Sequence, residues 1–230
     1  MGSSDLFRGT GVQLGPVFLA EPVLTTWGIM MVLTVGSWIV TRRLRLDPGP
    51  VQVVLEGLLN AADEAIRGVL PAQTTRLLPF IATLWLFIMV ANLSGLIPGV
   101  YAPTGDLSTT ASLAVLVFLS VHWFGIRAEG FRAYLRHYLA PLPLMLPFHL
   151  MSEFTRTLAL AVRLFGNIMS LEMAALLVLL VAGFLVPIPL LMLHIIEALI
   201  QAYIFGMLAL IYIAGAIHSQ QQVQPSQAQE

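Results

Sequence analysis

The amino-acid sequence predicts an all-α integral membrane protein with about five membrane helices. Of its 230 residues, 58% are hydrophobic and only 10% are charged, whereas soluble domains carry about 25% charged residues. The mean hydropathy is +0.87. Five apolar stretches are long enough to cross a bilayer, and segments rich in proline, glycine or arginine separate them. The chain has no cysteine, which excludes disulfides and thiolate metal sites, and we expect no cofactor.

The first third of the chain contains one predicted span and one amphipathic helix. The span covers residues 22–40 and ends at an arginine-rich run and a Pro-Gly-Pro turn. No short apolar core with a cleavage site precedes it, so we expect a retained span, with residues 1–21 as an external N-terminal segment. Residues 51–70 place apolar and polar side chains on opposite faces. This pattern favours a helix on the membrane surface, with a solvated linker helix as the alternative.

Two further spans and the arginine positions set the predicted topology. Residues 77–97 and 109–126 form the second and third spans. Segments 41–76 and 127–140 hold five and three arginines, whereas the opposite side holds only Arg8. By the positive-inside rule, the N-terminus lies outside and both basic segments are cytoplasmic.

The last two predicted helices are too long for a perpendicular crossing. Residues 148–182 would extend about 52 Å and residues 190–217 about 42 Å, against a hydrocarbon core of about 30 Å. We therefore expect a long, steeply tilted hairpin that completes a single membrane domain of residues 22–217. A disordered cytoplasmic tail, residues 218–230, is expected to follow. The alternative is one uncharged span over residues 173–193, but two prolines would then lie within it.

Polar side chains gather on one helix face within this apolar hairpin. At about 100° per residue, a stripe about 100° wide holds His149, Glu153, Arg156, Arg163, Asn167 and Ser170. A guanidinium stays charged, and placing it at the bilayer centre costs about 2.5 to 3.5 kcal/mol, so the stripe should face protein or water. Glu172 points away from the stripe. On the final helix, one face holds His194, Glu197 and Gln201.

In the predicted orientation, these groups form two polar pockets with Arg163 between them. The outer pocket contains Glu172, His194, Glu197 and Gln201. The inner pocket contains His149, Glu153 and Arg156. Carboxylates and imidazoles hold and pass protons, whereas a fixed guanidinium blocks a continuous cation path, so transport would need a mobile carrier such as a carboxylate on another subunit. The alternatives are that Glu153 and Arg156 only neutralise each other and that His122 is merely interfacial.

Two motifs resemble a known family. Residues 163–167 read Arg-Leu-Phe-Gly-Asn and are followed by Glu172, while His194 precedes Gln-Ala-Tyr-Ile-Phe at residues 201–205. This pattern resembles subunit a of the F-type rotary ATPases, most strongly over residues 148–217.

The resemblance implies a non-catalytic, ion-translocating stator subunit in a bacterial plasma membrane, with the ATP chemistry on other chains. Arg163 would face a ring of c subunits, with Asn167 in support and Gln201 packed opposite. Glu172 and His194 would belong to an outer half-channel. Further candidate half-channel residues are His149, Glu153, Ser170 and Glu197.

The resemblance also implies partners and leaves alternatives. The partners are the c-ring, subunit b or an equivalent peripheral stalk, the lipid bilayer and the transported proton. Residues 152–157 resemble the N-type branch, which leaves sodium as an alternative ion. A self-sufficient secondary transporter is the alternative function, but the two halves show no inverted repeat. No glycine-rich phosphate loop with lysine and no His-Glu-x-x-His motif occurs, so we expect neither ATP hydrolysis nor metallohydrolase chemistry here, and no nucleic-acid partner.

Overall fold

The computed structural model describes residues 11–14, 17–42, 49–97, 100–130, 146–182 and 187–221. A short antiparallel hairpin comes first, formed by β1 (Gly11–Leu14) and β2 (Val17–Ala20). The α-helices of the described residues are α1 (Glu21–Arg42), α2 (Pro50–Val69), α3 (Thr74–Ser94), α4 (Leu107–Glu129), α6 (Leu146–Ala182) and α7 (Pro187–Gln221). Two 3-10 turns, η1 (Pro71–Gln73) and η2 (Pro103–Gly105), precede α3 and α4.

The prediction of an all-α membrane protein is confirmed. Five of these helices, all except α2, are long and apolar enough to cross a membrane. The helix bounds lie within a few residues of the predicted spans, but the β-hairpin was not predicted. The alternative single span over residues 173–193 is wrong, because α6 ends at Ala182 and α7 begins at Pro187. Helix α7 also continues to Gln221, so the first residues of the predicted tail are helical, and residues 222–230 lie outside the described part of the chain.

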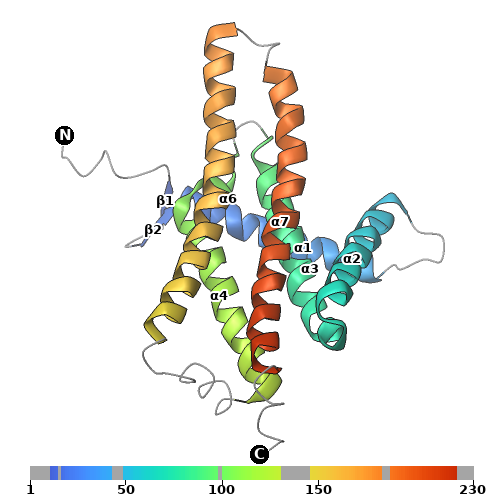
Figure 1. The fold of residues 1–230 in the computed structure, drawn as a ribbon. Helices are drawn as coiled ribbons and strands as arrows, with labels where there is room; N and C mark the ends of the chain where they lie inside the picture. Colours follow the sequence, from blue (N-terminus) through green and yellow to red (C-terminus); the bar gives the residue numbers. More distant parts are fainter. Residues whose placement is uncertain are drawn as a thin grey trace, which may run out of the picture.

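Helices α6 and α7 form a long antiparallel pair, and their upper ends extend beyond the other helices in Figure 1. Helix α3 packs against α7 and α2, whereas α4 packs against both α6 and α7. Helix α1 runs across the direction of α6 and α7 in the same view. The steep tilt expected for the α6 and α7 hairpin stays a prediction, since helix lengths alone do not place a membrane around these helices.

A close helix approach holds α3 against α7. Trp85 of α3 is 4% exposed, and its indole lies over the position of Gly206, where a Cβ atom would come within 1.5 Å of the indole Nε1. The Trp85 ring also packs on Tyr203, with ring centroids 5.2 Å apart. Small residues let membrane helices approach this closely, since association in lipid depends on packing rather than on the hydrophobic effect.

Helix α2 is amphipathic, as predicted. On its polar side, Gln52 donates a hydrogen bond to Glu56, and Arg67 forms an ion pair with Asp63 at 2.6 Å. Its apolar side is only partly covered, since several valines and a leucine stay exposed, namely Val51, Val53, Val54 and Leu59. An uncovered apolar face favours a helix on the membrane surface over a solvated linker.

Candidate functional site

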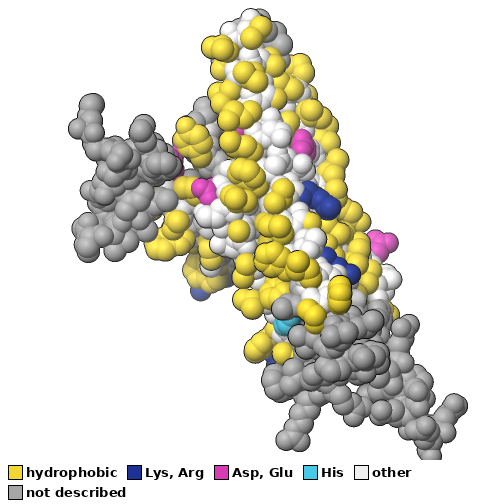
Figure 2. All heavy atoms as spheres, turned by 60° about the vertical axis from the view of Figure 1, so that its left-hand side comes forward, with side chains coloured by type: hydrophobic (Ala, Val, Ile, Leu, Met, Phe, Trp, Pro, Cys, Tyr) yellow, Lys and Arg dark blue, Asp and Glu magenta, His cyan; other side chains and the backbone are white. Residues whose placement is uncertain are grey.

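Arg163 lies on an outward side of α6. Its side chain is exposed, whereas Leu160 and Leu164 on adjoining faces of the helix are buried against the other helices. In the part of the chain that the structure describes, no carboxylate lies within salt-bridge distance of Arg163. Figure 2 shows basic side chains set among hydrophobic ones on one face of the molecule. The described residues therefore supply no anionic partner for Arg163.

Small side chains surround Arg163 on the exposed side of α6. At about 100° per residue, Ala159, Gly166 and Ser170 lie within about 60° of it around the helix axis. Ala159 and Ser170 are exposed, and a Cβ atom added at Gly166 would meet no atom within 4 Å. Another helix could therefore approach α6 closely beside the guanidinium.

A side-chain hydrogen bond joins α6 to α7 one turn from Arg163. Asn167 Nδ2 donates to Gln201 Oε1 at 2.7 Å. Gln201 is only 2% exposed, and its Nε2 is a buried donor without a partner in the described part of the chain. The structure thus places Asn167 beside Arg163 on the helix and Gln201 opposite it.

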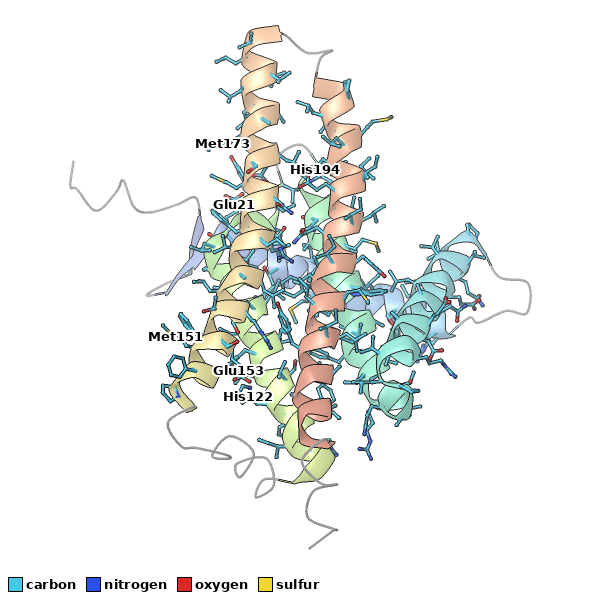
Figure 3. All side chains as sticks on the ribbon, in the orientation of Figure 1. Glu21, His122, Met151, Glu153, Met173 and His194 are labelled. Carbon is cyan, nitrogen blue, oxygen red and sulfur yellow. The ribbon has the colours of Figure 1, made fainter. Side chains whose placement is uncertain are left out.

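Glu172 and His194 lie in a polar region between α6, α7, η2 and the end of α3. The Glu172 carboxylate oxygens lie 3.4 and 3.5 Å from the Cβ position of Gly105, and the carboxylate interacts electrostatically with His194. His194 is 6% exposed, and its Nε2 donates to the backbone oxygen of Asn92 at 3.2 Å. In Figure 3, His194 lies on the upper half of α7, at a height similar to that of Met173, the residue after Glu172. Glu197 is half-buried one turn further along α7.

Glu153 and His122 meet near the other end of α6. His122 Nε2 of α4 lies 3.3 Å from Glu153 Oε2 of α6, with 27% and 19% of the two side chains exposed. Figure 3 shows both residues in the lower part of the molecule, between α4 and α6. Arg156 instead lies over the ring of Tyr212, with its guanidinium carbon 5.5 Å from the ring centroid. Glu153 therefore has a partner on another helix, His122 of α4.

The two remaining predicted site residues, Ser170 and His149, both lie on α6. Ser170 is exposed on the same side of α6 as Arg163, and His149 lies in the first turn of α6, with its side chain outside the described part of the chain. The described residues contain no group of three His, Asp or Glu side chains that could hold a metal ion.

The sequence reasoning missed Asn92 as a contact of the outer region. This residue is fully buried, accepts from His194 and donates from Nδ2 to the backbone oxygen of Ala198 at 3.5 Å. The sequence signal for Asn92 was an amide side chain near the end of an apolar span. Its contacts on α7 could not be found from the sequence, since they are about a hundred residues away.

Comparisons with known proteins give the family. A family profile described as ATP synthase A chain matches residues 23–214. A protein named ATP synthase subunit a 2 from Pelobacter propionicus is 66% identical over 207 residues, which cover 90% of this chain and 91% of that protein. A protein named ATP synthase subunit a from Legionella pneumophila is 59% identical over 220 residues, 95% of this chain and 96% of its own. A protein named ATP synthase subunit a 1 from Hahella chejuensis is 61% identical over 206 residues, 90% of this chain and 88% of its own.

These matches span nearly the whole chain and confirm the resemblance seen in residues 163–167 and 201–205. With five helices able to cross a membrane, the chain belongs to the ATP synthase A chain family, the non-catalytic, ion-translocating subunits of the F0 membrane sector.

Proposed function

We propose that this chain carries protons to and from a rotating ring of c subunits through two offset half-channels separated by Arg163. The observation that carries this proposal is the exposed guanidinium of Arg163 on α6, which has no carboxylate partner among the described residues and is set among small side chains. A charge in that position needs an anionic partner from outside the described chain. An ionisable carboxylate on each c subunit supplies such a partner, and a new one arrives as the ring turns.

The two half-channels correspond to the two polar regions. Glu172, His194 and Gln201 form the outer one, with Glu197 at its edge, and Glu153 with His149 forms the inner one. A ring carboxylate is protonated at one region and deprotonated at the other, and it passes Arg163 in the charged form. Since Arg163 cannot release its proton, it prevents direct proton flow between the two regions.

The same proposal fixes orientation and partners. The ends of α3, α4 and α7 that lie near Arg76, Arg127 and Ile217 face the cytoplasm, by the positive-inside rule. The N-terminus then lies on the external side of the membrane. We take this membrane to be a bacterial plasma membrane because the relatives named above come from bacteria. Helix α1 has a single buried residue, Ile29, among its described residues, and this uncovered helix is where we place the peripheral stalk, subunit b or its equivalent.

Silver ion labelling from each side of the membrane tests the two half-channels. The chain has no native cysteine, so Thr104→Cys, next to Gly105 in the outer region, and Thr157→Cys, next to the inner Glu153, each add its only thiol. Silver ions travel through water, so we expect external silver to inhibit ATP-driven pumping in Thr104→Cys and cytoplasmic silver to inhibit it in Thr157→Cys. Leu177→Cys, which is exposed on the apolar surface, is the control that neither treatment should affect. Inhibition of both reporters from the same side would contradict offset half-channels.

Gly166→Leu tests whether the exposed side of α6 docks the c-ring. A Cβ atom at Gly166 meets nothing within 4 Å, so a leucine side chain would start in open space and project beside Arg163. We expect the variant chain to insert normally while c-ring association and ATP-driven pumping fall by about tenfold or more, as over-packing costs about 1 to 3 kcal/mol. Gly57→Leu on α2, a position where a Cβ atom also meets nothing within 4 Å, is the matched control. If the two variants co-purified with equal amounts of c-ring, α6 would not be part of the c-ring interface.

A further inference from the structure

A second cationic site lies at the opposite end of the helices from the outer region. The first turns of α3 and the last turns of α4 and α7 surround a cavity of about 330 Å³. Arg76 of α3 and Arg127 of α4 both line it, together with Gln73 and Thr75. Neither arginine takes part in the translocation pathway proposed above.

The two guanidiniums have no carboxylate partner in the part of the chain that the structure describes. Both side chains are exposed, and no carboxylate of the described residues lies within salt-bridge distance of either. Two like charges that share one cavity repel each other. An anion between them would remove that repulsion and would accept hydrogen bonds from both.

The position of Arg76 cannot be explained by helix electrostatics. Arg127 lies in the last turn of α4, where a cation is favoured by the helix dipole. Arg76 instead lies in the first turn of α3, where the dipole disfavours a cation and favours an anion. That first turn contains no acidic residue, and its N-cap residue Gln73 makes no side-chain capping hydrogen bond. The positive end of the α3 dipole and the charge of Arg76 therefore both attract negative charge to this end of the helix.

The rest of the lining fits a lipid better than a small anion. Leu77, Phe124 and Ile217 give the cavity an apolar side next to the two arginines. The helix ends that form it are the ends of candidate membrane spans, on the side that the proposed orientation assigns to the cytoplasm. Basic pockets between membrane helices on this side suit phosphate headgroups, and guanidinium groups bind phosphate through paired hydrogen bonds.

We propose that this cavity binds the phosphate of an anionic phospholipid of the cytoplasmic leaflet, with Arg76 and Arg127 as the phosphate ligands and Leu77, Phe124 and Ile217 against the glycerol and the start of an acyl chain. The site is separate from the half-channels, so its test does not depend on ion translocation.

Lipid retention by the assembled complex tests the site. The complex is purified from membranes that contain phosphatidylglycerol, washed stepwise in detergent, and its bound lipid is measured by mass spectrometry. We expect Arg76→Gln/Arg127→Gln to retain at least about tenfold less phosphatidylglycerol at the stringent washes than the unmodified complex. The matched control is Arg42→Gln/Arg67→Gln, which removes two exposed arginines of the same membrane side that do not line the cavity. If the control variant lost as much phosphatidylglycerol, the effect would come from surface charge in general, and the proposal would be overturned.

Three further arms separate the possible ligands. Phosphatidylglycerol added to the washed complex should raise its unfolding temperature, while phosphatidylcholine and inorganic phosphate should not. An equal rise in unfolding temperature with inorganic phosphate would show that the cavity binds free phosphate. If the double glutamine variant lost another subunit but kept its lipid, the cavity would instead bind an acidic protein segment. Either result overturns the lipid assignment. Arg76→Lys/Arg127→Lys keeps the charge and should restore part of the retention. If the double glutamine variant does not assemble, Arg76→Gln alone carries the test, because it removes a cation that the helix dipole disfavours.

Discussion

Replacing Arg163 with alanine is expected to abolish ATP-driven proton pumping by the assembled complex in proteoliposomes. A pair of opposite charges about 4 Å apart contributes about 4 kcal/mol at an effective dielectric constant of 20. Losing that attraction in the step that releases the ring carboxylate would slow turnover about a thousandfold. Arg163→Lys should also be strongly impaired, since an ammonium group lacks the planar fork of a guanidinium. The measurement is acidification of the vesicle interior on ATP addition, followed with a pH-sensitive dye.

Arg156→Ala is the matched control for Arg163→Ala. Arg156 lies on the same side of α6, two turns away, is also exposed, and rests on Tyr212 rather than between the two polar regions. It should keep most of the pumping activity. Acidification in sodium-free buffer identifies the proton as the ion, and a requirement for sodium would identify the alternative. Normal pumping by a well-assembled Arg163→Ala complex would refute the proposed mechanism.

Replacing Gly206 with alanine is expected to prevent stable folding of the chain. The new Cβ atom would lie 1.5 Å from Trp85 Nε1 and 1.8 Å from Trp85 Cδ1. The indole is 4% exposed, so it has little room to move, and α3 and α7 would have to separate. Over-packing of a core costs about 1 to 3 kcal/mol and occasionally more. We expect a large drop in the level of assembled complex and in its thermal unfolding midpoint.

Gly215→Ala is the control for this substitution on the same helix. Its Cβ atom would meet nothing within 4 Å, and alanine favours a helix over glycine by about 1 kcal/mol. This variant should therefore match or exceed the stability of the unmodified chain. Combining Gly206→Ala with Trp85→Leu should recover part of the loss by removing the ring. If Gly206→Ala assembled and melted normally, the close approach of α3 and α7 described above would be wrong.

The pattern along one helix could be predicted, and the contacts between helices could not. The period of the α6 residues predicted that Asn167 and Glu172 point to different sides of the helix, and in the structure Asn167 contacts Gln201 whereas Glu172 lies beside Gly105. Helix length likewise predicted the long hairpin. These features depend on residues within a few turns of each other, which the geometry of the helix fixes.

The partners of Glu153 and Glu172 depend on which helices are neighbours. Glu153 had an available partner three residues away in Arg156, but α4 brings His122 to it instead. Glu172 meets the η2 turn, whose position follows from the packing of α3, α4 and α6. Hydropathy says that a helix crosses the membrane but carries no information about which helix lies next to it, so these contacts required the structure.

The hairpin of α6 and α7 has a mechanical consequence. Three polar contacts cross it at successive levels: Arg156 over Tyr212, Asn167 to Gln201, and Glu172 near His194. They are spread over about 24 Å of helix, and a slip of one turn, about 5.4 Å, would break all of them together. If a ring of c subunits turns against the exposed side of α6, as proposed above, it exerts a shearing force on the two helices. The three contacts across the pair would resist that force and keep the two helices in register.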